Sequence, residues 1–145
     1  MSQRLNFHQS GPGVMKALAG LEQQIARSSL EPALRELVRV RTSQLNGCAF
    51  CIDMHSVAAR QAGESERRLM LLPVWRETTL FSARESAALD WTEAVTHVAA
   101  THVPDDVWTR VQPHFSRAEL VDLTLLIGTM NTWNRFAIAF RMTPA

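Results

Sequence analysis

Several residue types are scarce in this sequence, and each shortage narrows what the protein can do. Tyrosine is absent, so no phenol is available as an acid or a base. Lysine occurs once, at Lys16; the arginines that supply the other positive charges are interleaved with acidic residues, and the formal net charge is +1. Because no basic stretch stands alone, we expect no nucleic-acid partner and interpret the arginines as a solvated surface.

Long apolar stretches are missing as well. Residues 1–6 are followed by no apolar stretch of the kind that marks a secretory signal. The longest uncharged stretch beside an apolar segment, residues 123–134, is too short to span a bilayer. We therefore expect a cytoplasmic protein without a membrane partner.

Cysteine occurs only twice, at Cys48 and Cys51. A secreted scaffold held by disulfides would have more cysteines, spread so that they tie distant segments together. A lone Cys-x-x-Cys pair in a reducing compartment indicates reactive thiols or a metal site instead.

What is present in the sequence favours one globular domain. The 145 residues fit a single domain over residues 1–145, and the 46% hydrophobic and 20% charged contents are ordinary for a folded chain. A chain of this length can bury a substantial core without disulfides or metals to hold it together.

Helical patterns dominate the chain. Apolar residues recur every three or four positions, and two capping boxes, Ser82 with Glu85 and Ser116 with Glu119, mark helix starts. The expected helices cover residues 14–27, 32–45, 48–62, 65–72, 82–95, 104–111 and 116–140. No segment alternates apolar and polar residues in the manner of a strand, so the sequence predicts an all-α fold.

The last expected helix, residues 116–140, has hardly any polar face. A helix that is apolar all round is normally buried. Either this helix lies in the centre of the monomer or another subunit covers it, and the sequence leaves both interpretations open.

The residues with the strongest chemical character are concentrated in the segment 46–55. The Asn-Gly dipeptide at 46–47 is a strong turn signal, so a helix is expected to begin near Cys48. At about 100° per residue, Cys48, Cys51 and His55 fall on one face of that helix. We expect Cys48 to be the exposed thiol and Cys51 to lie one turn deeper, nearer to His55.

This arrangement suits thiol redox chemistry for three reasons. The first turn of a helix favours a thiolate, because its backbone N–H groups lack partners within the helix. Two cysteines one turn apart lie within disulfide range. A histidine one turn further on can accept the thiol proton, directly or through a water molecule.

Two other interpretations of the cysteine pair stay open. A structural zinc site needs four ligands, and three of them on one helix face would give awkward tetrahedral geometry, so we expect neither a metal nor a bound cofactor. A buried, inert pair is the second alternative, because free cysteine packs as a small hydrophobe. Nothing in the sequence places another histidine beside Cys51. The four tryptophans are expected to pack in the core, which is the usual role of this residue.

Around these residues the sequence resembles the alkylhydroperoxidase D-like branch of the carboxymuconolactone decarboxylase superfamily. The matching pattern is a glutamate twelve residues before the first cysteine, the Cys-x-x-Cys motif, and a histidine four residues after the second cysteine. Here these residues are Glu36, Cys48, Cys51 and His55. The segment 131–136 also looks like the family, and the resemblance covers residues 14–142.

The resemblance implies an all-helical fold that assembles into homo-oligomers, either trimers or dimer-based hexamers. It also implies a thiol peroxidase that reduces organic hydroperoxides and hydrogen peroxide with a dithiol or protein reductant as partner. In that scheme Cys51 attacks the peroxide, and Cys48 resolves the sulfenic acid as a disulfide. Glu36 and His55 form the proton relay.

One position departs from the family pattern. The best-studied members carry a further histidine directly before the second cysteine, where this chain has Phe50, so the relay loses a polar group. Two alternative functions stay open: a redox-sensing oligomeric protein, or an enzyme like the decarboxylases of the superfamily without peroxidase activity. Those decarboxylases lack the cysteine pair, so its presence here argues against lactone decarboxylation.

Overall fold

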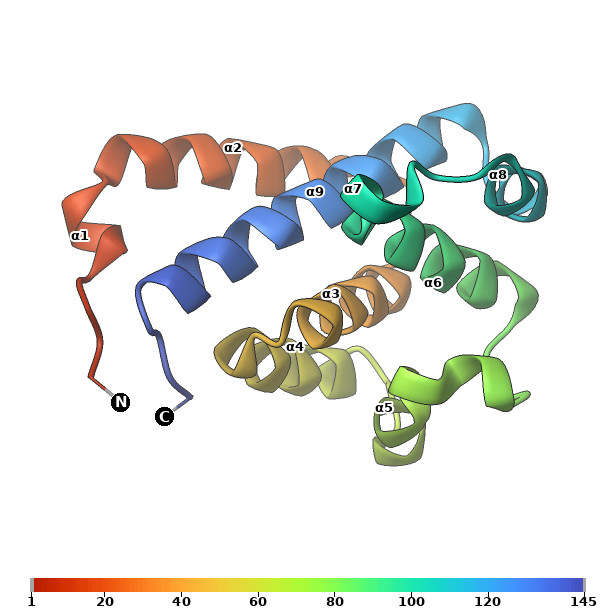
Figure 1. Cartoon of the computed structure of the whole chain (residues 1–145), viewed down its shortest axis with the longest axis horizontal. Coiled ribbons are helices and arrows are strands. Elements are labelled where there is room, and N and C mark those ends of the chain that lie inside the picture. The colour runs from red at the N-terminus through yellow and green to blue at the C-terminus, as the bar shows by residue number, and fades with distance from the viewer. Residues whose placement is uncertain (1, 145) are drawn as a thin grey trace.

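A computed structural model describes residues 2–144, and every regular element in that range is a helix (Figure 1). The first and last residues of the expected domain 1–145 lie outside the described range. The α-helices and the two 3₁₀ helices (η) are, in chain order, α1 (Phe7–Ser10), α2 (Pro12–Arg27), α3 (Pro32–Asn46), α4 (Ala49–Gln61), α5 (Glu66–Leu71), η1 (Leu72–Glu77), α6 (Ala83–Thr96), α7 (Val98–Thr101), α8 (Asp105–Val111), η2 (Gln112–His114) and α9 (Arg117–Ala139). The predicted all-α fold is confirmed.

The two predicted capping boxes are present in the structure. Ser82 accepts the backbone N–H of Glu85, and the Glu85 carboxylate accepts the backbone N–H of Ser82 in return. Ser116 and Glu119 form the same reciprocal pair at the start of α9. Each pair satisfies two N–H groups that the first turn leaves without a helical partner, so both capping boxes act as the sequence indicates.

Three short features differ from the sequence-based expectation. The helices α1 and α7 have four residues each, which is too short for an apolar period to reveal them. The helix expected over 65–72 is α5 up to Leu71, and from Leu72 the chain continues through Pro73 as the tighter helix η1. Proline has no N–H to continue an α-helix, yet its fixed φ fits the first turn of a new helix.

The helix α9 runs through the middle of the molecule. It packs against α2, α3, α4 and α6, and Figure 1 shows it (blue) lying alongside α2. Leu123, Ile127 and Met130 on its inner side are fully buried, whereas Val121 is 70% exposed. The helix is therefore central within the monomer over most of its length, and cover by another subunit stays a prediction for the exposed remainder. Within residues 2–144, no helix combines the length and apolar character needed to cross a bilayer.

Among residues 2–144 the buried side chains form three groups, two of which share α3. The largest joins α3 to α2, α6, α8 and α9, and the second joins it to α4, α5, η1 and α6. A third, smaller group lies between α4 and α9 and contains both cysteines. The α3–α4 hairpin is thus packed on both sides, which fixes the cysteine pair relative to the rest of the fold.

The N-terminal segment is fastened to the end of α9. The Arg4 backbone N–H donates to the Phe140 carbonyl, and its Nη1 donates to the Ala139 carbonyl, both at 3.0 Å. Phe7 is buried against the rings of Phe136 and Phe140. These contacts bring α1 close to the cysteine pair in space, although the two segments are far apart in the sequence.

Candidate active site

The turn between α3 and α4 positions the cysteine pair. Gly47 ends α3 with φ of 69°, a left-handed conformation that suits glycine, and Cys48 is the N-cap residue of α4. The Cys48 Sγ accepts the backbone N–H of Cys51 at 3.3 Å. The predicted helix start near Cys48 is confirmed, and its sulfur takes the role that an oxygen usually has at an N-cap.

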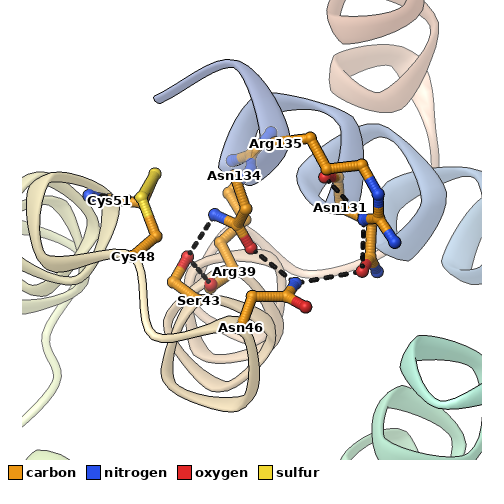
Figure 2. Close-up of a disulfide and its surroundings, with 8 residues drawn as sticks. All are labelled: Arg39, Ser43, Asn46, Cys48, Cys51, Asn131, Asn134 and Arg135. Atoms are coloured by element: carbon orange, nitrogen blue, oxygen red, sulfur yellow. Dashed lines mark hydrogen bonds between the residues drawn. A yellow bond between two sulfur atoms is a disulfide. The ribbon is translucent and has the colours of Figure 1, made fainter. Parts of the chain in front are cut away.

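Cys48 and Cys51 are joined by a disulfide, with Cα atoms 5.3 Å apart (Figure 2). Both residues are only 2% exposed. The expectation that Cys48 is the exposed thiol is therefore wrong. As the N-cap residue, Cys48 directs its sulfur back over the first turn of α4, and Met130 and Ala137 of α9 pack against the pair.

A cavity of about 380 Å³ lies beside the disulfide. Its wall is mostly apolar, with a few charged and polar groups from α1, α2, α3 and α4. The lining residues are Phe7, His8, Glu22, Arg39, Phe50, Cys51, Met54, His55, Met130, Trp133, Ala137 and Met142. Of the two cysteines, Cys51 belongs to this lining, so Cys51 is the sulfur that a small molecule in the cavity meets.

Glu36 and His55 face each other between α3 and α4. Glu36 Oε2 lies 2.9 Å from His55 Nδ1, and the two side chains are 15% and 14% exposed. Burial by itself would raise the pKa of Glu36, but the hydrogen bond with His55 and the positive charge of Arg39 outweigh it, so this pKa lies below its usual value. Glu36 is therefore a carboxylate at neutral pH. It accepts the Nδ1–H of His55, which leaves Nε2 as the basic nitrogen of the ring.

The four residues singled out in the sequence are brought together by the structure. Cys51 and His55 are one turn apart on α4 and line the same cavity. Glu36 holds His55 from α3, and Cys48 is bonded to Cys51. The arrangement can supply a sulfur nucleophile, a base with a fixed tautomer, and a second sulfur within bonding distance.

Three further polar residues extend the pair of Glu36 and His55, and the sequence pattern did not reveal them. Arg39 donates to Glu36 through Nη1 and to Glu22 of α2 through Nη2, the latter at 2.7 Å. Trp133 of α9 donates its Nε1–H to Glu22 at 3.0 Å. The Arg39 side chain is 13% exposed, so the interpretation of the arginines as a solvated surface is wrong here.

Sequence spacing could have suggested only part of this network. Glu36 and Arg39 are three positions apart on one helix, a spacing at which oppositely charged side chains can form an ion pair. Glu22 and Trp133 reach them from α2 and α9, and no local pattern connects those helices. Core packing, the role expected for the tryptophans, is not the whole role of Trp133. This side chain also lines the cavity and donates a hydrogen bond.

A second polar network connects the turn before the cysteine pair to α9 (Figure 2). Asn46 Nδ2 donates to Asn134 Oδ1 at 2.8 Å and to Asn131 Oδ1 at 3.0 Å. The fully buried Asn134 donates to Ser43 Oγ at 3.1 Å, and that hydroxyl donates to the Arg39 carbonyl at 2.8 Å. This network gives a physical role to the segment 131–136, because it holds the hairpin at a fixed position against α9.

The remaining histidines fall into two groups. His97, His102 and His114 lie at the ends of short helices on the α6–α8 side of the molecule. His8 of α1 lines the cavity and stacks on Trp133, with ring centroids 6.4 Å apart. Among residues 2–144, no three His, Cys, Asp or Glu side chains are arranged to hold a metal ion.

Comparison with known proteins identifies the family. Residues 12–94 match the model of the carboxymuconolactone decarboxylase family. YdfG of Bacillus subtilis (strain 168), an uncharacterized protein, is 42% identical over 139 residues, which are 96% of this chain and 95% of YdfG. The chain belongs to the carboxymuconolactone decarboxylase family.

Solved structures agree with this assignment. A protein of unknown function from Agrobacterium tumefaciens, for which an AhpD antioxidant-defence role has been suggested, superposes with a TM-score of 0.95 and 41% identity over 99% of both chains. The debrominase Bmp8 superposes with a TM-score of 0.80 over 94% of this chain and 74% of its own, and its 18% identity supports the fold alone. The chain thus has the compact helical AhpD-like fold that the sequence resemblance implies.

Proposed function

We propose that this protein is a thiol-dependent peroxidase that reduces organic hydroperoxides or hydrogen peroxide through a dithiol–disulfide cycle of Cys48 and Cys51. The observation that carries the proposal is the position of Cys51. This sulfur is one half of the disulfide, it lines the cavity, and it lies one helical turn from His55, which Glu36 holds at 2.9 Å.

The first step uses the reduced pair. His55 accepts the thiol proton of Cys51, and the ionised Glu36 balances the positive charge on the ring. The Cys51 thiolate then attacks the terminal oxygen of the hydroperoxide, the O–O bond breaks, and Cys51 becomes a sulfenic acid. The alkoxide takes the proton from His55 and leaves as an alcohol, or as water when the substrate is hydrogen peroxide.

The second step closes the disulfide. The Cys48 thiol attacks the Cys51 sulfur, a bond forms between the two sulfurs, and water leaves. The Cα separation of 5.3 Å allows this without moving the backbone. A dithiol or protein reductant then reduces the disulfide and is itself oxidised. One hydroperoxide and one dithiol thus give one alcohol, one water and one new disulfide.

The cavity wall favours an apolar substrate. Phe50, Met54 and Met130 line it, and Phe50 stands where the best-studied relatives have a histidine. An apolar wall gains free energy by burying the alkyl or aryl group of an organic hydroperoxide, a contribution that hydrogen peroxide does not offer. Organic hydroperoxides are therefore the preferred substrates in this proposal.

We also propose a cellular location and an oligomeric state. Because the cycle needs a reductant for its disulfide, we place the protein in the cytoplasm, where thiols are kept reduced. A groove between α2, α8 and α9 presents apolar side chains, among them Val121, which is 70% exposed, and Trp108, which is 46% exposed. We assign this groove to a homo-oligomer contact, in a trimer or a hexamer.

A peroxide-consumption assay tests the proposal. Reduced protein is mixed with cumene hydroperoxide or hydrogen peroxide and an excess of dithiothreitol, with Cys51→Ser as the control. Catalytic loss of peroxide with the native protein, and none above background with the variant, is the expected result. A native protein that turns over no peroxide contradicts the proposal.

The same preparation separates the alternatives. A redox sensor would change its oligomer size on oxidation without turnover, and a decarboxylase-like enzyme would release carbon dioxide from a lactone whether or not the cysteines are present. Since Bmp8 is a debrominase crystallised with 2,3,4-tribromopyrrole, a brominated pyrrole is included as well. Debromination without peroxide turnover would assign the dithiol to reductive dehalogenation.

A further inference from the structure

We infer that Arg39 is a positioning residue for this chemistry: anchored by Glu22, it holds Glu36 as a carboxylate aimed at His55. The inference rests on the proposed function, because it concerns the relay that serves Cys51. Arg39 is not assigned contact with the substrate's reacting atoms. It acts through Glu36.

The hydrogen bonds around Arg39 are continuous. Trp133 Nε1–H donates to Glu22 Oε1 at 3.0 Å, and Glu22 Oε2 accepts from Arg39 Nη2 at 2.7 Å. Arg39 Nη1 donates to Glu36 Oε1, and the other oxygen of Glu36 lies 2.9 Å from His55 Nδ1. One chain of contacts therefore runs from the cavity wall on α9, through α2 and α3, to the ring of His55 on α4.

The charge of Arg39 is shared by two carboxylates. Glu22 and Glu36 are two partly buried carboxylates, and Arg39 lies between them with its side chain 13% exposed. The titratable groups bonded to Glu36 are Arg39 from its own helix and His55 from α4, and Glu22 of α2 bonds to the other terminal nitrogen of Arg39. His8 of α1 and Cys51 of α4 line the adjacent cavity. The residues that α9 contributes to the lining carry no titratable side chain. Without the guanidinium, only His55 would oppose the effect of burial on Glu36, the second carboxylate would lose its counter-charge, and the proton affinity of Glu36 would rise.

The guanidinium of Arg39 has the shape that this double contact needs. Its two terminal nitrogens reach two different carboxylates at the same time. An ammonium group at this position would be a single point charge on a flexible stem, without the planar fork that holds both partners. Arg39→Lys should therefore keep the charge but loosen the orientation of Glu36.

The chain contains a matched control for this network. Two residues further along α3, Arg41 pairs with Glu93, and the Trp75 Nε1–H donates to the same glutamate at 2.7 Å. The Arg41 side chain is 11% exposed, close to the value for Arg39. This second Trp–Glu–Arg set lies away from the cavity, so Arg41→Met removes a comparable ion pair without touching the site.

Two measurements on the intact chain test the inference. The first is the pKa of Glu36, from ¹³C NMR titration of the glutamate carboxyl carbons, with Glu36→Gln assigning the signal; it needs no peroxide. In Arg39→Met we expect this pKa to rise by about one to three units, the range that a neighbouring charge produces. In Glu22→Gln it should fall, because a like charge is removed while the Trp133 hydrogen bond is kept. Arg41→Met should leave it unchanged.

The second measurement is kcat/KM for peroxide reduction as a function of pH. The acid limb should move to higher pH in Arg39→Met, move to lower pH in Glu22→Gln, and stay in place in Arg41→Met. A purely structural role does not produce shifts of opposite sign. If Arg39→Met does not fold, Arg39→Lys and Glu22→Gln still carry the test through kcat and the same titration.

The outcomes distinguish a failure of the Arg39 inference from a failure of the proposed peroxidase function. A Glu36 pKa that shifts as expected in a protein without peroxide turnover supports the network and overturns the proposed function. Full peroxide turnover with a Glu36 pKa unchanged in Arg39→Met overturns the inference and leaves the function standing. Equal shifts in Arg39→Met and Arg41→Met also overturn it.

Discussion

Replacing Glu36 by glutamine tests the centre of the site with little change in shape. The substitution keeps the length of the side chain and removes its charge, so the hydrogen bonds with His55 and Arg39 lose their ionic character. A hydrogen bond to a charged group contributes about 1.5–3 kcal/mol, against about 0.5–1.5 kcal/mol for a neutral one. Arg39 retains Glu22 as a partner, so the two losses are not fully additive. We expect Glu36→Gln to lower the free energy of unfolding by about 1–3 kcal/mol.

The pH dependence of this loss follows from the pKa of Glu36. In the folded protein that pKa lies below its usual value, because the bond with His55 and the charge of Arg39 outweigh burial. The stabilisation is therefore complete above the unfolded-state pKa of about 4.3 and is lost as the pH falls through the lower folded-state pKa. In urea unfolding, the difference in unfolding free energy between the native protein and Glu36→Gln should be fully developed at about pH 6, where Glu36 is ionised in both the folded and the unfolded state. The difference should shrink below about pH 4.

The same variant should also slow peroxide reduction. The rise in the activation free energy of that reaction should exceed the loss in the free energy of unfolding. Loss of an oriented proton relay typically lowers a rate by about 10²–10⁴-fold. Glu93→Gln is the control, because Glu93 is 21% exposed, pairs with Arg41 and Arg76, and also has a pKa lowered against burial by its hydrogen bonds with Trp75 and these arginines. The Glu93→Gln variant should lose a similar amount of unfolding free energy and keep its peroxidase activity. A Glu36→Gln rate equal to the native one, or an equal loss of rate in Glu93→Gln, would refute the reasoning.

Three further predictions address the disulfide, the hairpin and the assembly. Mild peroxide treatment of the reduced protein should remove two hydrogen atoms from the single peptide that holds Cys48 and Cys51, because their Cα atoms are 5.3 Å apart; mass spectrometry that finds only intermolecular disulfides contradicts this. Asn134→Ala should lower the free energy of unfolding by about 2–3 kcal/mol, since it leaves the buried hydroxyl of Ser43 and the half-buried amide of Asn46 short of a partner; a loss below about 0.5 kcal/mol in urea unfolding would remove the proposed clamp. Val121→Asp, on the exposed apolar groove, should dissociate the homo-oligomer in light scattering; a native protein that is a monomer at every working concentration rules that assembly out.

The fold was largely predictable because its signals are local. Capping boxes at Ser82 and Ser116, the turn at Gly47 and the apolar periods lie within a few residues of the helix ends that they specify. The short helices α1 and α7 were not predictable in this way, since four residues do not span a full apolar period.

The site was predictable only where spacing along the chain equals proximity in space. Cys51 and His55 are one turn apart on one helix, so their common face follows from helical geometry. Glu36 was singled out by resemblance, because a residue on another helix has no local signal. Glu22 reaches the site from α2 and was missed for the same reason. The burial of Cys48 was missed because it depends on how α9 packs over the hairpin.

The most direct test of the central claim compares the two cysteine variants in a single turnover. Reduced protein is mixed with an excess of cumene hydroperoxide without a reductant, and the peroxide consumed per chain is counted. Cys48→Ser should consume one equivalent and stop as a sulfenic acid on Cys51, because that sulfur lines the cavity and has lost its resolving partner. Cys51→Ser should consume none. Peroxide consumption by Cys51→Ser, or none by Cys48→Ser, would contradict the assignment of Cys51 as the sulfur that meets the substrate.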